Sequence, residues 1–392
     1  MKKSSLSGGR VRAGPARAGS GRAGRVMSVC YCLAFFLLSQ VLMEFLMPLG
    51  LVYQHRVEFE ILKDNPADID CVLDLIKRTI EREGISEYFI ILGDSVAYSG
   101  PGGPEQSVSR YMNDIARERG LPPVFNLAVP AAQAGDFYTL LLKLEEKGIS
   151  TDNVIINLIY GGFVKRDPRP PVVYWFYRDL EKLDPEAYEA VRLHLDQAQA
   201  AETGEKPRKI NEQIQEFLQY RVFPFVPVLK YRDFIRDAIF RKAGVPRTTG
   251  DARPWYEKPY LPGLLKQAEY QRLFSPEPVV LDDSNPNVFF LKKIAELQRG
   301  KNLFVFMSPV NSELMKEEVS RPGYRKNLSE INAFMDQLAR DYSFHYRDLS
   351  DAIPQELFSD HLHLVSGGYQ KLAEILWEWV ETANQGQWER RE

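Results

Sequence analysis

The chain has 392 residues, of which 44% are hydrophobic, 12% aromatic and 26% charged, so it holds enough apolar material for one large domain or two smaller ones with a buried core. Its net charge of −3 hides an asymmetry: residues 1–25 carry seven basic and no acidic residues, whereas the remainder carries 43 basic against 53 acidic residues. This acidic main body excludes nucleic acid as the expected partner.

The N-terminal part combines a basic tail with a long apolar run. Residues 1–25 are rich in Arg, Gly, Ala and Ser without a core-forming pattern, and we expect them to be disordered. Residues 26–53 follow with a single acid, Glu44, and exceed the roughly 20 residues that cross a bilayer. The preceding bases predict a cytoplasmic N-terminus. The sequence thus predicts a single-pass cell-membrane protein that contacts the lipid bilayer through residues 26–53, with its main domain outside the cytoplasm.

A cleaved signal peptide is the alternative interpretation of this run. Its apolar core would be shorter, about 7–15 residues, and would end in a small-x-small cleavage site. The segment LMPLGLVYQ at the end of the run contains no such triplet, which favours the uncleaved anchor. Residues 54–70 then look like a polar segment that leads away from the membrane.

Beyond the anchor, short apolar segments alternate with helical ones, which is typical of βαβ units and a parallel sheet. The segments with a strand pattern are Tyr88–Leu92, Val124–Val129, Asn153–Tyr160, Asn302–Met307 and Phe344–Leu349. The alternation covers residues 54–163, stops, and returns over residues 285–392. We therefore predict an α/β fold, a three-layer sandwich around a central parallel sheet of about five strands, built from these two parts of the chain.

Residues 164–284 interrupt the pattern and are predicted to be a mainly helical insertion or cap. Its aromatic clusters, Tyr174–Tyr177 and Trp255–Tyr260, suit either a sugar-binding platform or the core of the cap, and packing is the commoner use of such side chains. Val228–Lys242 mixes apolar and basic residues. It fits either a helix on a membrane surface or an ordinary amphipathic helix, which we favour.

Three polar residues stand where an α/β protein builds a site. Ser95 follows the first strand in the tripeptide Gly-Asp-Ser, and Asp360 and His363 precede the last helix. A carboxylate three residues before a histidine can hold its Nδ1–H and leave Nε2 for a serine, which makes the three a nucleophile, base and orienter. Polar turn residues and a helix cap are the simpler interpretation, and His361 is a competing base. The three cysteines lack metal-ligand spacing, so we expect neither metal nor cofactor.

These segments resemble the conserved blocks of the SGNH/GDSL hydrolase superfamily, whose fold is a flavodoxin-like sandwich. GDS after the first strand resembles the first block, and DHLHLVSGGY resembles the last. NLAVPAA resembles the second block, and SPVN resembles the loop after the fourth strand. The resemblance covers residues 69–163 and 285–384. It implies an ester-cleaving serine at Ser95, activated by His363 and Asp360.

The resemblance is incomplete around the oxyanion hole. The second-block glycine aligns with Ala131, whose N–H would hold the oxyanion together with that of Ser95; Gly135 is the fallback donor. The third block lacks its asparagine, and Gly162, which takes its place, is the third residue expected at the oxyanion hole. Loss of one such donor costs roughly 10²–10³ in rate. Asn157 looks too deep in its strand to substitute. The residues expected to contact substrate are Asp94, Asn126, Gly135 and Asn311.

The sequence thus favours a membrane-anchored, extracytoplasmic serine esterase or O-acyltransferase. By resemblance its substrate is an acylated, chiefly acetylated, cell-envelope polysaccharide, and a membrane-bound acyltransferase is a possible partner. The alternative is an SGNH-like module that binds an envelope glycan or such a partner without catalysis. The missing asparagine favours the alternative, and the intact Ser-His-Asp set favours the enzyme.

Overall fold

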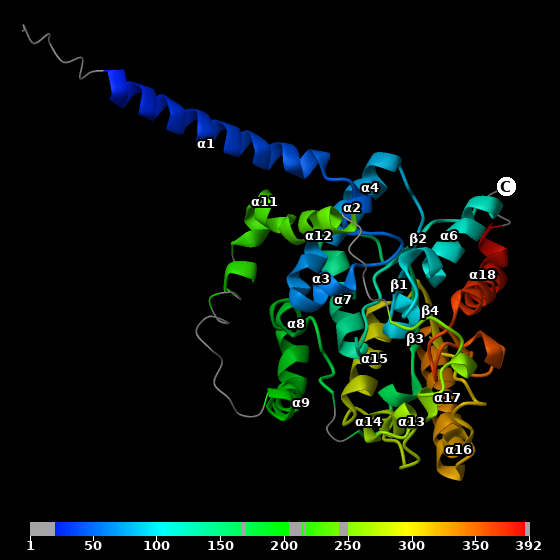
Figure 1. Cartoon of the computed structure of the whole chain (residues 1–392). Helices are drawn as coiled ribbons and strands as arrows, with labels where there is room; N and C mark the ends of the chain where they lie inside the picture. Colours follow the sequence, from blue (N-terminus) through cyan, green and yellow to red (C-terminus); the bar gives the residue numbers. More distant parts are fainter. Residues whose placement is uncertain are drawn as a thin grey trace, which may run out of the picture.

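The computed structural model describes residues 20–166, 170–203, 214, 217–220, 222–242 and 250–388 (Figure 1). Most of the basic tail predicted over residues 1–25 lies outside the described residues. Its last part, from Ser20, already belongs to the first helix, α1 (Ser20–Leu46). The prediction of disorder is therefore replaced by helix from Ser20 onward, where the chain runs without a break into the apolar segment.

A five-stranded sheet forms the centre of the molecule and confirms the predicted α/β class. Its strands are β1 (Phe89–Leu92), β2 (Val124–Asn126), β3 (Asn153–Leu158), β4 (Asn302–Met307) and β5 (His345–Asp348). They lie in the order β2-β1-β3-β4-β5, and every pairing is parallel. The chain leaves β1 toward β2 and returns to the other side of β1 with β3. The order therefore reverses at β1, and the carboxyl end of this strand lies where open α/β sheets bind ligands.

Helices cover both faces of the sheet, because side chains alternate along each strand (Figure 1). On one face, Phe89 and Ile91 pack with Trp377 and the helices α6 (Val108–Arg119) and α18 (Ser366–Trp388). On the other face, side chains such as Ile90 pack with a larger set of helices. These are α4 (Ile69–Glu83), α7 (Ala134–Glu146), α15 (Pro286–Leu297) and α17 (Pro322–Tyr342). The result is the predicted three-layer sandwich.

The N-terminal apolar run is divided into two parts. Within α1, the window Val26–Met43 has the length and composition of a membrane span or a signal sequence, and none of it is buried in the domain. The helix ends at Leu46, before Pro48, and the short helix α2 (Leu49–Val52) packs into the domain core. The predicted anchor range of 26–53 is therefore too long at its C-terminal end, because Val52 belongs to the core.

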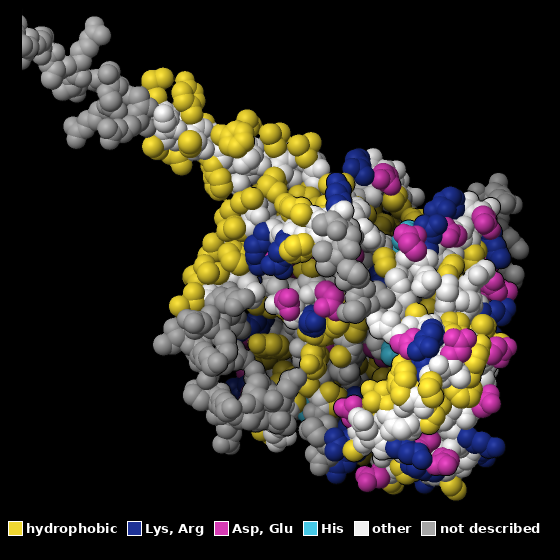
Figure 2. All heavy atoms as spheres, viewed as in Figure 1, with side chains coloured by type: hydrophobic (Ala, Val, Ile, Leu, Met, Phe, Trp, Pro, Cys, Tyr) yellow, Lys and Arg dark blue, Asp and Glu magenta, His cyan; other side chains and the backbone are white. Residues whose placement is uncertain are grey.

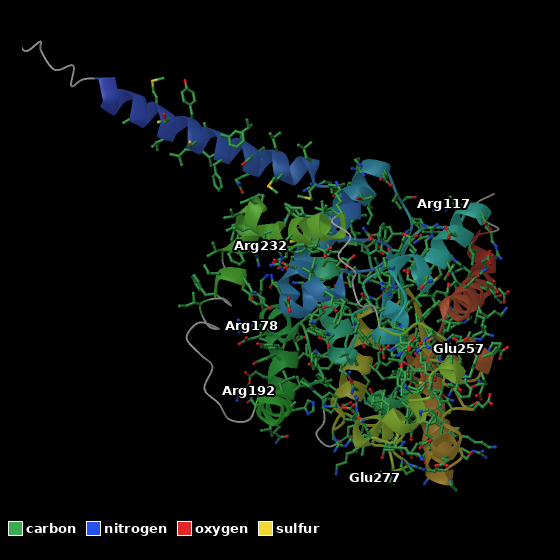
Figure 3. The ribbon with its side chains drawn as sticks, in the orientation of Figure 1. Arg117, Arg178, Arg192, Arg232, Glu257 and Glu277 are labelled. Carbon is green, nitrogen blue, oxygen red and sulfur yellow. The ribbon has the colours of Figure 1, made fainter. Side chains whose placement is uncertain are left out.

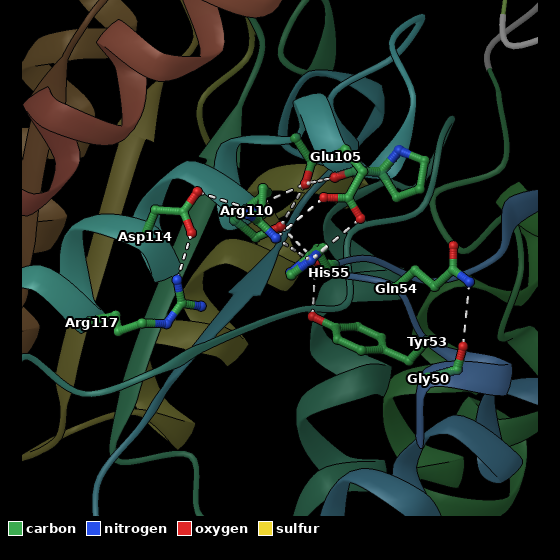
Figure 4. A network of polar contacts seen from close by, with 11 residues as sticks. Gly50, Tyr53, Gln54, His55, Glu105, Arg110, Asp114 and Arg117 are labelled. Atoms are coloured by element: carbon green, nitrogen blue, oxygen red, sulfur yellow. Dashed lines mark hydrogen bonds and ion pairs between the residues drawn. The ribbon is translucent and has the colours of Figure 1, made fainter. Parts of the chain in front are cut away.

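Residues 54–70 are also part of the domain rather than a polar linker. They contain α3 (Phe59–Asp64) and a 3₁₀ turn, η1 (Pro66–Asp68), and they bury Val57, Ile61 and Leu62. Figure 4 shows how the start of this segment is held: Tyr53 donates to the carbonyl of His55, and the His55 ring faces Arg110 and Glu105. The chain that follows α1 and α2 is thus fixed to the sheet domain.

The region predicted as an insertion is mainly helical where it is described. Its elements are α8 (Tyr177–Leu183), α9 (Pro185–Thr203), η4 (Phe223–Phe225), α11 (Pro227–Lys230), α12 (Arg232–Lys242), η5 (Trp255–Glu257), α13 (Leu261–Leu265) and α14 (Ala268–Arg272). The buried carboxylate of Asp136 on α7 accepts hydrogen bonds from the backbone N–H groups of Tyr174, Trp175 and Phe176. The first aromatic cluster is therefore anchored to the domain.

The remaining short elements complete the fold: α5 (Ser95–Tyr98), η2 (Pro104–Gln106), η3 (Tyr160–Gly162), α16 (Lys316–Val319) and η6 (Gln355–Leu357). Among them, α5 and η3 follow β1 and β3 directly, and η6 precedes the Asp360–His363 loop. The turns α5 and η3 thus both lie at the carboxyl ends of neighbouring strands, β1 and β3.

A matched pair of leucines tests the packing of the sandwich. Leu372→Ala on α18 removes a fully buried side chain and is expected to lower the free energy of unfolding by about 2–5 kcal/mol. Leu193→Ala on α9, where the leucine is 71% exposed, should change it by no more than about 0.5 kcal/mol. Denaturant unfolding of the detergent-solubilised chain measures both. Equal effects of the two substitutions would contradict the assigned core.

Candidate active site

Ser95 stands at the point where β1 turns into a short helix. It is the first residue of α5, and the Asp94 side chain caps this helix by accepting from the N–H of Val96 at 2.9 Å. Gly93 makes the turn possible, because a Cβ at this position would lie 1.7 Å from the side-chain oxygen of Asn157. Ser95 therefore lies at the edge of the sheet, after a turn that has no room for a side chain at position 93.

Asn157 on β3 locks this turn in place. Its Oδ1 accepts from the N–H of Asp94 at 2.9 Å, and its Nδ2 donates to Asp94 Oδ1 at 2.8 Å and to Ser308 Oγ at 3.0 Å. The side chain is fully buried, so Asn157 lies too deep to reach a substrate, as its position inside the strand indicated. Its contribution is to tie the ends of β1, β3 and β4 together beneath Ser95.

The loop before α18 brings Asp360 and His363 to Ser95. His363 Nε2 lies 2.8 Å from Ser95 Oγ, and His363 Nδ1 lies 2.8 Å from Asp360 Oδ2. The second carboxylate oxygen of Asp360 accepts from the N–H groups of Leu362 and His363, at 2.9 and 2.8 Å. The carboxylate is thus oriented by the backbone of its own loop. It holds the imidazole so that the other ring nitrogen faces the serine hydroxyl.

The electrostatics of the pair suit a general base. Burial alone would lower the pKa of His363, but the neighbouring Asp360 carboxylate outweighs it and raises this pKa above the ordinary 6.5. Burial would raise the pKa of Asp360, but His363 and the hydrogen bonds it donates hold this pKa far below its usual range. Asp360 therefore stays ionised, and His363 is neutral only above its raised pKa.

His361, the competing base, faces away from the serine. Its ring is buried against Tyr270 and Phe274, and neither ring nitrogen has a hydrogen-bond partner within the described part of the chain. Burial lowers the pKa of His361 and outweighs the opposite effect of the Asp360 carboxylate, whose Oδ1 lies 3.5 Å from His361 Nδ1. The structure therefore brings His363, and not His361, to the nucleophile.

The expected oxyanion donors are the backbone N–H groups of Ser95 and Ala131. Ala131 has a φ of 65°, the left-handed conformation that glycine adopts easily, so the alanine keeps the backbone path of the glycine it replaces. Across the described residues, no hydrogen-bond partner is recorded for the N–H of Ser95 or of Ala131. The N–H of Gly162, by contrast, donates to Ile159 at 2.9 Å, so the expectation that Gly162 supplies a third donor is wrong.

The four residues expected to contact substrate make hydrogen bonds within the fold. Asp94 caps α5, and Asn126 is fully buried and donates to the carbonyl of Ala97 at 2.7 Å. The N–H of Gly135 donates to the carbonyl of Val172 beneath α7, and a Cβ there would collide with Val173. Asn311 is buried and donates to the carbonyl of Asp360 at 3.2 Å, which steadies the histidine loop. All four residues are therefore engaged by the fold, as expected of buried polar groups and of a tightly packed glycine.

A cleft of about 500 Å³ opens above the serine and histidine. Its walls come from the loop after α5, from Pro130 and from the juxtamembrane segment 54–60. In this segment Arg56 is buried and donates to the carbonyls of Tyr98, Ser99 and Gly102 at 2.9, 2.9 and 2.6 Å. Arg56 was not among the residues predicted for the site, although its segment also carries Val57, Ile61 and Leu62 at helical spacing, which indicates packing.

Comparisons with known proteins leave the family open. No family model matches the chain, and no curated protein matches it. Among solved structures, the chain is similar to a carbohydrate acetylesterase family member from Sinorhizobium meliloti, with 9% identity and a TM-score of 0.32. The alignment covers 76% of this chain and 98% of that one. A similarity this low assigns neither family nor activity, so the functional argument depends on the geometry of the site.

The coupling between Asp360 and His363 is measurable without a substrate. Because the carboxylate raises the pKa of His363, NMR titration of labelled histidines should place its midpoint above the ordinary 6.5. Asp360→Asn removes the negative charge and leaves the burial, so the midpoint should fall below that value. His345 on β5, whose pKa is lowered by burial alone, serves as the control and should not move. An unchanged His363 midpoint in the variant would contradict the ion pair.

Proposed function

We propose that the protein is a serine-dependent ester hydrolase or O-acyltransferase. One observation carries the proposal: Ser95 Oγ, His363 Nε2, His363 Nδ1 and Asp360 Oδ2 form a continuous hydrogen-bonded line with two contacts of 2.8 Å. This is the arrangement in which an imidazole can take the serine proton while a carboxylate stabilises the resulting imidazolium. It opens into a cleft large enough for a sugar-sized group.

In the proposed reaction Ser95 Oγ attacks the ester carbonyl carbon while its proton passes to His363 Nε2. The carbonyl oxygen, now negatively charged, accepts from the N–H groups of Ser95 and Ala131. The tetrahedral intermediate collapses, the bond to the leaving alcohol breaks, and His363 returns the proton to that alcohol. Water or a second alcohol then repeats the sequence on the acyl-serine, giving either hydrolysis or transfer. Asp360 stays ionised throughout.

The proposed location is the outer face of the cell membrane, with α1 as an uncleaved anchor. The contact between α1 and the domain supports this choice over a signal peptide: the N–H of Val228 on α11 donates to Gln40 Oε1 at 3.0 Å. Met43 and Met47, at the end of the apolar run, also pack against the domain core. A segment destined for removal has no need of such contacts.

The proposed substrate is an acylated, chiefly acetylated, polysaccharide of the cell envelope. The cleft supports a substrate near the bilayer, because Gln54 on its wall lies eight residues after the end of α1. An extended chain of that length spans at most about 28 Å. Among otherwise largely apolar lining residues, Glu58 and Glu60 place two carboxylates on the cleft wall, which can accept hydrogen bonds from the hydroxyl groups of a sugar. A membrane-bound acyltransferase remains the proposed partner for transfer chemistry.

A non-catalytic glycan-binding module is the alternative. It would require no contact between the serine and the histidine, and their 2.8 Å separation favours catalysis instead. The site still lacks one oxyanion donor, the third-block asparagine whose place Gly162 takes. Its absence favours slow or transferase-like chemistry.

Replacement of the nucleophile tests the proposal. Ser95→Ala should lower hydrolysis of an acetyl-ester probe by at least about 10³-fold and abolish labelling by a fluorophosphonate, because it removes the hydroxyl that forms the acyl intermediate with the ester and the phosphonyl adduct with the label. Ser284→Ala, at an exposed serine outside the cleft, is the matched control and should keep both signals. Full esterase activity of Ser95→Ala would exclude the assigned nucleophile.

Restoring the absent donor tests the oxyanion hole. Gly162 has no atom within 4 Å of where a Cβ would stand, and it shares a small cavity with Asp94. Gly162→Asn is therefore expected to fold and to raise kcat for ester hydrolysis, by up to about 10²-fold if its amide reaches the oxyanion. Gly162→Leu, which adds similar bulk without a donor, should give no gain. Equal rates for the two variants would place the oxyanion away from Gly162.

A further inference from the structure

An apolar surface in the insertion lies beside α1. We call Phe223–Lys242, which comprises η4, α11 and α12, the interfacial segment. It exposes large hydrophobic side chains: Phe225 is 79% exposed, Ile239 61% and Phe240 51%. Figure 2 shows hydrophobic atoms gathered beneath α1 on this side of the molecule. Exposed apolar side chains in such number mark a contact surface on a protein whose core is otherwise well covered.

Along α1, this surface lies level with the C-terminal end of the apolar window Val26–Met43. The N–H of Val228, at the start of α11, donates to Gln40 Oε1 at 3.0 Å. Gln40 stands three residues before Met43, the end of the window, which corresponds to about 4.5 Å along a helix. A residue in contact with Gln40 therefore lies at the boundary of the bilayer that α1 would span.

The opposite side of the interfacial segment is fixed to the domain. Tyr231 and Phe234 are fully buried, and Lys230 Nζ pairs with Asp74 of α4 at 2.8 Å. These contacts prevent the segment from turning over to bury Phe225 and Phe240. The exposed apolar side chains are thus held outward by the fold.

Basic residues border the apolar ones. Arg236 and Lys242 on α12 are exposed next to Ile239 and Phe240, and Arg236 also pairs with Asp233 at 3.1 Å. Figure 3 shows Arg232 on the side of the molecule near α1, whereas Glu277 lies at the far end. Apolar side chains flanked by long basic ones are the composition of segments that lie in the headgroup region of an anionic membrane.

We propose that the interfacial segment is a second membrane contact, in which Phe225, Ile239 and Phe240 enter the headgroup region of the bilayer that α1 spans. The proposal rests on α1 being a span, as proposed above, and it is independent of the ester chemistry. Two contacts on one bilayer would stop the domain from rotating about α1. The cleft, whose wall includes residues 54–60 directly after α1 and α2, would then keep one orientation toward the membrane surface.

Lipid-quenching of site-directed labels tests the contact in the full-length chain. On a background with Cys30, Cys32 and Cys71 changed to alanine, single cysteines are placed by Phe225→Cys, Phe240→Cys, Leu38→Cys and Glu317→Cys and labelled with bimane. The protein is reconstituted in phosphatidylcholine vesicles containing phosphatidylglycerol, with or without headgroup spin-labelled lipid. Labels at 225 and 240 should lose roughly half of their fluorescence. Glu317 is exposed on α16, far from α1, and its label should be unaffected.

The controls separate the outcomes. Tail-spin-labelled lipid should quench the Leu38 label in α1; if it does not, α1 is not a span and both proposals about the membrane fail. If Leu38 is quenched but 225 and 240 respond like 317, the second contact is excluded while the anchor stands. Labels at 225 and 240 that are shielded from aqueous iodide but untouched by spin-labelled lipid would indicate a second copy of the chain on this surface, which also overturns the proposal. None of these readouts depends on Ser95.

Discussion

The paired hydrogen bonds between Asn157 and Asp94 are the constraint on which the active centre depends. They join the turn after β1 to the interior of β3, and a third bond reaches Ser308 after β4. Parallel pairing of β1 with β3 and of β3 with β4 is what brings these groups together. A buried network of this kind is stabilising only when all of its polar atoms are satisfied. Ser95 is consequently placed by the sheet itself and not by a loose loop.

A second layer of support comes from residues that are distant in sequence. Arg56 ties the loop after α5 to the juxtamembrane segment, and Tyr369 on α18 donates to the carbonyl of Gly100 in the same loop at 2.6 Å. Lys258, after η5, is buried and donates to both oxygens of Ser359, next to Asp360. The nucleophile loop and the histidine loop are therefore each held by groups from outside the sheet, one from the N-terminal segment and one from the insertion.

Most of the sheet and the three reactive residues could be predicted from the sequence, because both follow local patterns. Short apolar runs that end in Gly or Pro mark the strands, and Asp360 and His363 lie close enough in sequence for their pairing to be argued from spacing. The roles of Asp94, Asn126, Gly135 and Asn311 could not be predicted. Asp94, Asn126 and Asn311 are polar and follow or end a strand, and Gly135 lies in the first turn of α7; only the three-dimensional structure shows that hydrogen bonds within the fold engage all four.

The C-terminal end of the predicted anchor could not be predicted from the sequence either, for a related reason. Hydropathy does not distinguish apolar residues that face lipid from those that face a protein core, so residues 49–53 were grouped with the span. The expected role of Gly162 failed for a similar reason. Alignment to a motif gives the position of a residue but does not show that its N–H already donates to another group. Burial and hydrogen-bond partners are properties of the folded chain, and they account for each of these differences.

The attachment of Arg56 has a practical consequence for where the catalytic domain begins. A version of the protein shortened to its sheet, starting near β1, would lack the guanidinium that braces the loop behind Ser95 and one wall of the cleft. A cut between Leu46 and Leu49, at the break that contains Pro48, would instead release a domain with its active centre whole. If α1 spans a membrane, as proposed, a protease that cut at this break would release the domain with Arg56 and the cleft undisturbed.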